Sequence, residues 1–403
     1  MTSAQHDIPN PPTDTISSLQ FSPSTTYIAV ASWDRTVSIY KRAESDSDTP
    51  FAFSHRIQCR APVLDLCWGA DDSSLYCVGL DYDVRSLPNP NDPNGDDSQR
   101  VLSTHEAASN KIAYSREEDL LLSTSWDGTL HIHIHPSSQQ DMRFTRLRLS
   151  AKPFALSLSV DKAVLAMAER KVSVYDLRAL GMLVEQTGGT SDREDIQEGI
   201  QPWQQRESSL KFMTRALACM PDNTGFTIGS IEGRCGVEWF DPERQKDTYA
   251  FKCHRHVHES IADPADPDLG LTESELAEAK ANPSKAYLED LELVYPLNAL
   301  AFHPLHGTFA TGGGDGLVYV WDREAKKRVK VYDFGKEVES VACVDFSGDG
   351  RFMGVGLSPP LGAQDEGEEV EVERIRVVVR VLAEGELKGK GKVAKKKSGE
   401  GEA

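Results

Sequence analysis

The chain has 403 residues, 39% of them hydrophobic, and no apolar run approaches the roughly 20 residues that a membrane-spanning helix needs. The formal net charge is −19, and because residues 388–403 hold six Lys and two Glu (+4), residues 1–387 carry −23, which disfavours nucleic acid as a partner. With no secretory signal at the start and seven cysteines without Cys-x-x-Cys spacing, we expect a soluble, intracellular protein with reduced thiols.

A repeated unit runs along the chain. A β-branched or aromatic strand ends in a tight acidic turn, and alternating hydrophobic residues follow. The turn acids recur roughly every 45 residues over the first four repeats and at wider intervals after that; they are Asp34, Asp81, Asp127, Glu169, Glu232 and Asp315. This is the WD40 period, stretched by insertions, and it predicts an all-β fold, a seven-bladed β-propeller.

The strands of each blade can be placed from the turns. In blade 1 the first three strands are expected at residues 18–23, 27–31 and 37–40, with the acidic turn between the second and the third. Second and third strands recur at 120–123 with 130–133, and at 308–311 with 318–321. The seventh unit starts at 337–344 and ends at 374–379 without an outer strand. We expect the segment before Ile16 to supply that strand and close the ring.

Composition marks the insertions. Residues 87–98 and 184–205 join third to fourth strands and read as loops on the face opposite the acidic turns. Residues 256–290 join blades 5 and 6 on the turn side, and residues 272–280 within them resemble a capped helix. A further loop is expected at 359–371. We assign residues 1–387 to the propeller and 388–403 to a disordered basic tail, which fits an import signal or a merely solubilising segment.

Signals for catalysis are poor, since the chain has no Gly-rich phosphate loop, no Gly-x-Ser-x-Gly elbow and no complete zinc motif. His131, His133 and His135 alternate along one strand, so they would share a face either as metal ligands or as a solvated or inter-blade stripe. The run 253–258 is also dense in possible ligands but lacks a second cluster. We expect no enzyme, no metal and no cofactor; a metal-dependent propeller hydrolase is the alternative of another class.

Two tryptophans occupy matching turns. Trp33 and Trp126 precede the turn acids of blades 1 and 3, so they should stand on one face near the central channel. Exposed tryptophan is a common interface anchor, and a partly buried packing role is the alternative. Trp321 instead ends a third strand, where its indole should pack between blades.

Basic residues converge on the same face of blade 5. On an otherwise acidic chain they would form a pocket for phosphate or paired carboxylates, which suit guanidinium groups. The residues are Lys211, Arg215, Arg234 and Lys252. Ordinary ion pairs with Glu207, Glu232 or Glu238 are the alternative.

Several segments resemble the Bub-type WD40 family of the spindle assembly checkpoint. They are 206–212 (Arg-Glu-Ser-Ser-Leu-Lys-Phe), 229–234 (Gly-Ser-Ile-Glu-Gly-Arg), 249–255 (Tyr-Ala-Phe-Lys-Cys-His-Arg), 295–298 and 309–313. A sister family, the WD40 messenger-RNA export factors that dock on nucleoporins, shares Ile-Glu-Gly-Arg and Lys-Cys-His-Arg. The Arg-Glu-Ser-Ser-Leu-Lys run and Tyr-Ala-Phe favour the checkpoint family.

The resemblance implies a non-catalytic adaptor of the nucleus, and of the kinetochore in mitosis. A short segment of a checkpoint kinase or its relative would bind across the turn face through Trp33 and Trp126, and Arg215 would meet glutamates of the segment, with Lys211 beside it. Arg234 and Lys252 match residues that recognise phosphothreonine in Met-Glu-Leu-Thr repeats of a kinetochore scaffold. An export adaptor that binds a nucleoporin is the alternative, and neither role implies a membrane or direct contact with nucleic acid.

Overall fold

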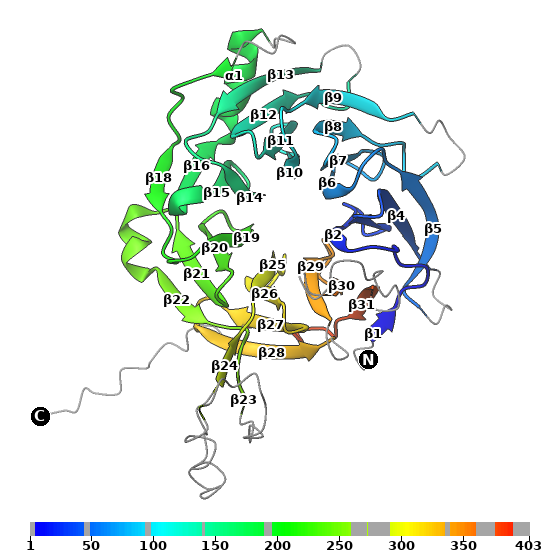
Figure 1. Cartoon of the computed structure of the whole chain (residues 1–403), viewed down its shortest axis with the longest axis vertical. Coiled ribbons are helices and arrows are strands. Elements are labelled where there is room, and N and C mark those ends of the chain that lie inside the picture. Colours follow the sequence, from blue (N-terminus) through cyan, green and yellow to red (C-terminus); the bar gives the residue numbers. More distant parts are fainter. Residues whose placement is uncertain are drawn as a thin grey trace, which may run out of the picture.

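The computed structural model describes residues 5–43, 49–92, 98–138, 142–188, 196–258, 272, 291–334, 339–359 and 375–389. Seven four-stranded antiparallel sheets surround a central channel, and one of them carries an additional fifth strand (Figure 1). No helix within these ranges is long and apolar enough to cross a membrane. The seven-bladed propeller predicted from the repeat is therefore confirmed.

Each blade runs outward from the channel in chain order. Blades 1 to 3 consist of β2 (Ile16–Phe21), β3 (Tyr27–Ser32), β4 (Thr36–Arg42) and β5 (Phe51–Gln58); β6 (Val63–Trp68), β7 (Leu75–Gly79), β8 (Asp83–Ser86) and β9 (Arg100–Thr104); and β10 (Ser109–Ser115), β11 (Leu120–Ser125), β12 (Thr129–Ile134) and β13 (Arg143–Arg148). Blades 4 and 5 consist of β14 (Pro153–Leu158), β15 (Lys162–Met167), β16 (Lys171–Asp176) and β18 (Gln204–Glu207); and β19 (Thr214–Cys219), β20 (Gly225–Ser230), β21 (Arg234–Trp239) and β22 (Tyr249–Lys252). Blade 6 consists of β25 (Leu297–Phe302), β26 (Thr308–Gly313), β27 (Leu317–Asp322) and β28 (Lys327–Asp333). Short 3-10 turns, η1 (Ala168–Arg170) and η2 (Pro242–Asp247), lie in blades 4 and 5.

Blade 7 combines both ends of the described chain. Its strands β29 (Ser340–Phe346), β30 (Phe352–Ser358) and β31 (Arg376–Val381) are completed by β1 (Gln5–Asp7), which pairs antiparallel with β31. The guanidinium of Arg376 donates to Asp7 Oδ1 at 2.8 Å and to Glu339 Oε2 at 2.8 Å, and the bond to Asp7 adds an ionic contact between β31 and β1. The predicted closure by the segment before Ile16 is confirmed.

The core lies between neighbouring blades. The second strand of every blade is buried along its whole length, which explains why these strands consist almost entirely of apolar and small residues. In blade 6 a hydrogen-bonded chain ties the turn to the core, because Asp315 Oδ1 lies 2.8 Å from His254 Nδ1 and Thr311 Oγ1 lies 2.9 Å from His254 Nε2. Trp321 Nε1 donates to Thr311 Oγ1, and the indole lies 4.5 Å from the ring of Phe251 in blade 5, as predicted for inter-blade packing.

The turn acids have a structural role. Asp34 Oδ1 accepts from the backbone N–H of Thr36 at 2.9 Å, and Asp127 Oδ1 accepts from that of Thr129 at 2.8 Å. These bonds close a tight turn whose next residue adopts a left-handed backbone, with φ 68° at Arg35 and φ 80° at Gly128. The acids therefore fix the turns that carry Trp33 and Trp126.

The expectation of a plain loop at 184–205 is wrong. The connection from β16 to β18 contains α1 (Leu177–Thr187), which Asp176 caps by accepting from the N–H of Ala179 at 3.1 Å. It also contains β17 (Ile196–Gln197), which pairs in parallel with β13 and adds a fifth strand to blade 3. The buried side chains of α1 repeat at helical spacing, at Leu177, Leu180 and Val184. The prediction failed because this pattern begins before residue 184, the start of the stretch whose composition suggested a loop.

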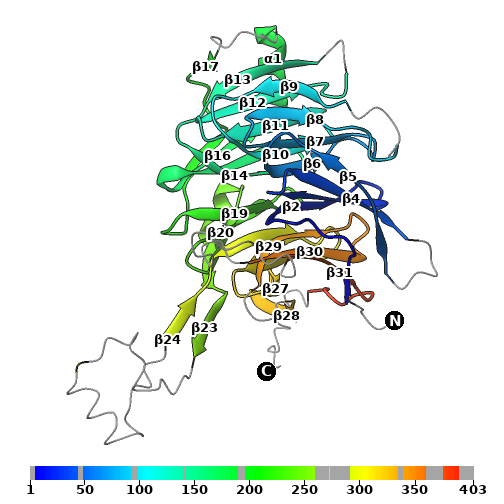
Figure 2. The ribbon, with the colours of Figure 1, turned by 45° about the vertical axis from the view of Figure 1, so that its right-hand side comes forward.

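The insertion between blades 5 and 6 begins and ends as a two-stranded hairpin. β23 (Arg255–His258) pairs with β24 (Leu291–Val294), and the hairpin projects from the ring in both views (Figures 1 and 2). The helix expected at 272–280 lies outside the described residues except for Thr272. The loop at 359–371 beyond residue 359, the tail beyond residue 389, and the middle of the 87–98 loop lie outside them as well.

Candidate functional site

Trp33 and Trp126 stand on the upper face, which we define as the face that bears the acidic turns. The backbone N–H of Trp33 donates to Thr15 O at 3.0 Å, and that of Trp126 donates to Ala108 O at 3.1 Å. The side chains nevertheless remain 40% and 42% exposed. A fixed backbone with an uncovered indole is the arrangement of an interface anchor and favours that interpretation over packing between blades.

A cavity of about 650 Å³ opens at the upper mouth of the channel, and we call it the upper cavity. Trp33, Trp126 and Arg215 all line it, so the structure brings together three of the four residues predicted to bind a partner segment. The fourth, Lys211, is exposed in the link before β19 and is not among the lining residues. Apolar walls come from Phe154, Met213 and Tyr295, none of which was predicted from the sequence to bind a partner.

The charge of the upper cavity is opposite to that of the chain. Its ionisable lining consists of Lys111, Lys152 and Arg215, and no acid lines it among the residues that the structure describes. Lys152 Nζ lies 5.0 Å from the ring centroid of Trp126. A chain of net charge −19 thus presents a cationic, aromatic mouth, which suits an acidic peptide with apolar anchors. Lys111 and Lys152 were missed because no repeat motif contains them.

Arg234 and Lys252 form a separate basic cluster on the rim of blade 5. They are opposite each other in the pairing of β21 with β22, at the upper ends of these strands. Neither residue lines the upper cavity, so the structure does not bring Arg234 and Lys252 together with Arg215 there. Arg234 Nε lies 3.3 Å from Glu232 Oε1, so the alternative of an ordinary ion pair holds for this contact.

Arg255 lies beside Arg234 and Lys252, and we call these three residues the rim cluster. Arg255 ends the segment 249–255 quoted for the family resemblance, but that motif did not show that its side chain lies next to Arg234. Its guanidinium donates through Nε to the backbone carbonyl of Glu232 at 3.1 Å and lies 3.6 Å from Glu232 Oε2. Glu232 therefore faces two arginines, and Lys252 is exposed beside them. Among the described residues named here, three cationic side chains accompany one carboxylate, and such an excess of positive charge favours phosphate.

The histidines of blade 3 are structural. His131 and His133 are buried, and Ser103 Oγ lies 2.9 Å from His131 Nδ1 and 2.8 Å from His133 Nε2. The shared face expected for three histidines fails at His135, because β12 ends at Ile134 and His135 turns away with φ 50° to contact Asp119 at 2.9 Å. No group of three potential metal ligands occurs among the described residues.

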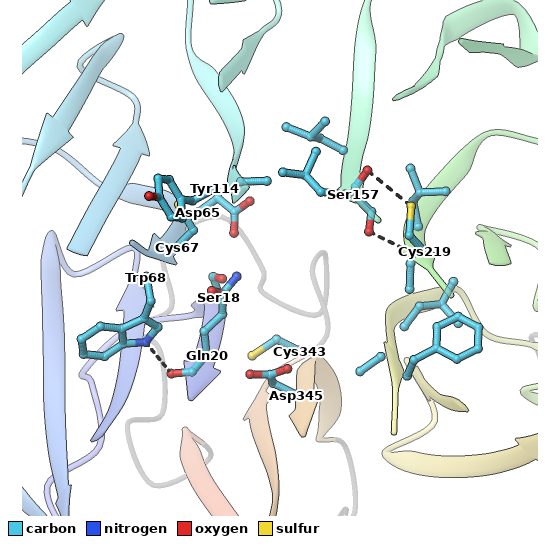
Figure 3. A pocket seen from close by; sticks show the side chains of 18 of the residues that line it. Ser18, Gln20, Asp65, Cys67, Trp68, Tyr114, Ser157, Cys219, Cys343 and Asp345 are labelled. Carbon is cyan, nitrogen blue, oxygen red and sulfur yellow. Dashed lines mark hydrogen bonds between the residues drawn. The ribbon is translucent and has the colours of Figure 1, made fainter. Parts of the chain in front are cut away.

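The lower mouth of the channel holds a second cavity of about 770 Å³, which we call the lower cavity. Its side chains join the innermost strands of neighbouring blades, as Figure 3 shows: Trp68 Nε1 donates to Gln20 O at 3.1 Å, and the backbone N–H of Cys219 donates to Ser157 Oγ at 3.0 Å. Asp345 Oδ2 makes the equivalent bond between blade 7 and blade 1, accepting from Phe21 N–H at 2.9 Å. These bonds give the lower cavity a structural role.

Replacing Asp345 with asparagine should stabilise the protein at alkaline pH. Burial raises the pKa of Asp345 to about 7, so the folded state holds a proton that the unfolded state releases above its ordinary value of 3.8. The stabilising contribution is therefore complete below about pH 4 and is lost as the pH rises to 7. Asparagine keeps an acceptor for Phe21 N–H without the charge. We expect the melting temperature of Asp345→Asn to exceed that of the native chain by several degrees at pH 8 and by clearly less at pH 5, where only part of the contribution has been lost; a gain of equal size at both pH values would contradict the assignment.

Comparison with known proteins agrees with the fold and extends over nearly the whole chain. The family "WD domain, G-beta repeat" matches residues 5–41, 96–133 and 294–322. The chain is similar to mitotic checkpoint protein BUB3.1 of Arabidopsis thaliana, with 33% identity over 396 residues, 97% of this chain and 96% of that protein. It is 28% identical to mitotic checkpoint protein bub-3 of Caenorhabditis elegans, over 87% of this chain and 86% of the relative. It is also 27% identical to a poly(A)+ RNA export protein of Schizosaccharomyces pombe, over 87% of this chain and 83% of the relative.

Proposed function

The chain belongs to the Bub3 family of WD40 mitotic checkpoint proteins, and from this we propose that it is a non-catalytic adaptor that carries a checkpoint kinase to a phosphorylated kinetochore scaffold. A short segment of the kinase or its relative binds in the upper cavity. A phosphorylated Met-Glu-Leu-Thr repeat of the scaffold binds at the rim cluster. The protein acts in the nucleus and, during mitosis, at the kinetochore.

The observation that carries this proposal is the separation of two cationic sites on one face. Trp33, Trp126 and Arg215 line the upper cavity, whereas Arg234 and Lys252 lie outside it on the rim of blade 5. Two ligands can therefore be held at the same time, which an adaptor needs. Aromatic anchors with charge-assisted hydrogen bonds suit short linear segments better than a catalytic reaction.

Arg234→Ala should weaken binding of a synthetic peptide that contains a Met-Glu-Leu-phosphothreonine repeat by roughly tenfold or more. The change removes a charge-assisted hydrogen bond to the phosphate, which contributes about 1.5 to 3 kcal/mol. Calorimetry measures the dissociation constant. Arg178→Ala is the matched control, because Arg178 lies on α1, in a connection at the opposite face, and its side chain is largely exposed. An unchanged affinity in Arg234→Ala would remove the phosphate site from the proposal.

The messenger-RNA export role remains the second candidate, favoured by the similarity to the poly(A)+ RNA export protein of Schizosaccharomyces pombe. Both roles use capture of a short segment, so the partner distinguishes them. Affinity purification from mitotic cells should recover the checkpoint kinase and the scaffold. Recovery of a nucleoporin alone would favour the export adaptor.

A further inference from the structure

Asp345 is an acid at a position where the fold needs only a hydrogen-bond acceptor. Its carboxylate accepts from the N–H of Phe21 at 2.9 Å and so joins blade 7 to blade 1. Ser157 does the same between blades 4 and 5, where its hydroxyl accepts from the N–H of Cys219 at 3.0 Å. An uncharged side chain therefore suffices for this bond, which leaves the negative charge of Asp345 without a structural explanation.

No cation of the described chain offsets that charge. Burial raises the pKa of Asp345, and only the backbone N–H groups of Phe21 and Phe346 act in the opposite direction. Asp65, another acid of the lower cavity, is different, because Lys111 Nζ lies 3.5 Å from its Oδ2. A carboxylate deep in a protein without a counter-charge is costly, so Asp345 would be stabilised by a cation that enters from outside.

A ligand can reach Asp345 through the lower cavity. Asp345 lines this cavity of about 770 Å³ and is only partly buried, and Figure 3 shows its side chain beside Cys343. Apolar residues of other innermost strands, among them Leu19 and Phe302, line the cavity as well. Cavities of about 300 to 1,000 Å³ suit small ligands. A ligand of the lower cavity would therefore combine a cationic group with an apolar stem.

We propose that the lower cavity binds a linear polyamine and that the carboxylate of Asp345 holds one of its primary ammonium groups. The ammonium donates charge-assisted hydrogen bonds, and the methylene chain lies against the apolar residues of the wall. The net charge of −19 concentrates such cations around the protein. A free amine fits better than the lysine of a protein segment, because Asp345 belongs to β29 and lies inside the channel rather than on a turn at its mouth. This inference goes beyond the proposed function, whose two ligands bind at the upper face.

The test uses the full chain and spermidine as the probe. Calorimetry at pH 8 should show that spermidine binds the native chain and that Asp345→Asn weakens this binding about tenfold or more, because the charge-assisted hydrogen bond is lost. Glu117→Gln is the matched control, since it removes the same charge from an exposed residue of the same cavity. It should weaken binding by less than about threefold, and that loss should disappear in high salt.

A thermal melt at pH 8 gives a second measurement. Without ligand, Asp345→Asn is expected to melt above the native chain, because the variant lacks the uncompensated charge. Saturating spermidine should raise the melting temperature of the native chain and leave that of Asp345→Asn nearly unchanged, so the difference between the two should shrink.

Several results would overturn the proposal. If spermidine does not bind, or binds Asp345→Asn as tightly as the native chain, Asp345 holds no ammonium group. An equal loss in Asp345→Asn and Glu117→Gln would show that spermidine is attracted by general charge. If a blocked Gly-Gly-Lys-Gly-Gly peptide binds more tightly than spermidine and loses this advantage in Asp345→Asn, the ligand is a lysine of a protein segment and not a free polyamine.

Discussion

Replacing Trp33 or Trp126 with alanine is expected to weaken binding of the kinase segment by at least about 30-fold, with little change in the melting temperature. Each indole is about two-fifths exposed at the upper cavity, so its removal costs the folded protein few contacts. A bound segment would cover the same surface, and aromatic anchors of this kind contribute about 2 kcal/mol or more to binding.

Calorimetry of the segment and a thermal melt of each variant measure the two quantities independently. Trp203→Ala is the matched control, because Trp203 is 50% exposed and precedes β18 in the connection on the opposite face. It should leave segment binding unchanged. A large fall in melting temperature with little loss of affinity would show that Trp33 and Trp126 are packing residues.

Acidification from pH 7.5 to pH 5.0 is expected to cost the native chain roughly 2 kcal/mol of unfolding free energy for each of His131 and His133. Burial lowers the pKa of His131 well below its ordinary value of 6.5 and that of His133 to about 3. Below pH 6.5 these imidazoles therefore bind protons in the unfolded state but remain neutral in the folded state, so the free energy of unfolding falls as the pH drops from 7.5 to 5.0. The figure follows from about 1.4 kcal/mol per pH unit.

The groups around these rings determine the sign. His105 stacks on His131 at 3.5 Å and is itself buried, Arg146 lies near both, and the carboxylate of Asp127 is 3.4 Å from His105 Nδ1. Burial lowers the pKa of His105 despite Asp127, so this carboxylate does not reverse the effect.

Chemical denaturation at the two pH values tests this expectation. Glutamine at position 133 cannot take up a proton, so His133→Gln should reduce the acid-induced loss of unfolding free energy by about 2 kcal/mol. This difference between the two pH values does not depend on how much stability the substitution removes at neutral pH. The opposite contribution of Asp345 is common to native and variant chains and cancels in the comparison. His135→Gln is the control on the same blade, because half of that side chain is exposed. An equal loss in native chain and His133→Gln would contradict the assignment.

The sequence was sufficient for the features that a local pattern determines. Asp34 and Asp127 predict their turns because a carboxylate that accepts from the N–H two residues ahead defines a tight turn by itself. Position within the repeat then placed Trp33 and Trp126 on one face. The pairing of β1 with β31 could be predicted because the last blade lacked a strand, and ring closure leaves one source for it.

Features that depend on contacts between blades could not be predicted in this way. Lys111 is an unremarkable lysine in a strand until blade 5 places Arg215 near it in the channel. Helix α1 was missed because most of its apolar positions precede residue 184, where the stretch interpreted as a loop begins. The helix is stabilised by packing against blades 3 and 4, which the local sequence does not show. His131 and His133 were ambiguous for the same reason, since Ser103, which satisfies both rings, comes from another blade.

The seam in blade 7 also governs when the protein can finish folding during synthesis. β1 leaves the ribosome before the other strands and its partner β31 after them, so every other blade can form before the ring is able to close. Until then Ile8 and Ile16 lack the apolar cover that Val377 and Val379 provide in the finished core. Bringing together ends separated by several hundred residues costs about 5 kcal/mol of loop entropy, and pairs so distant in sequence form slowly. The newly made chain therefore passes through a stage in which the edge of β31 is unpaired and the apolar face beneath it is uncovered. During that stage the chain stays soluble only if aggregation is slower than ring closure or if chaperones bind it.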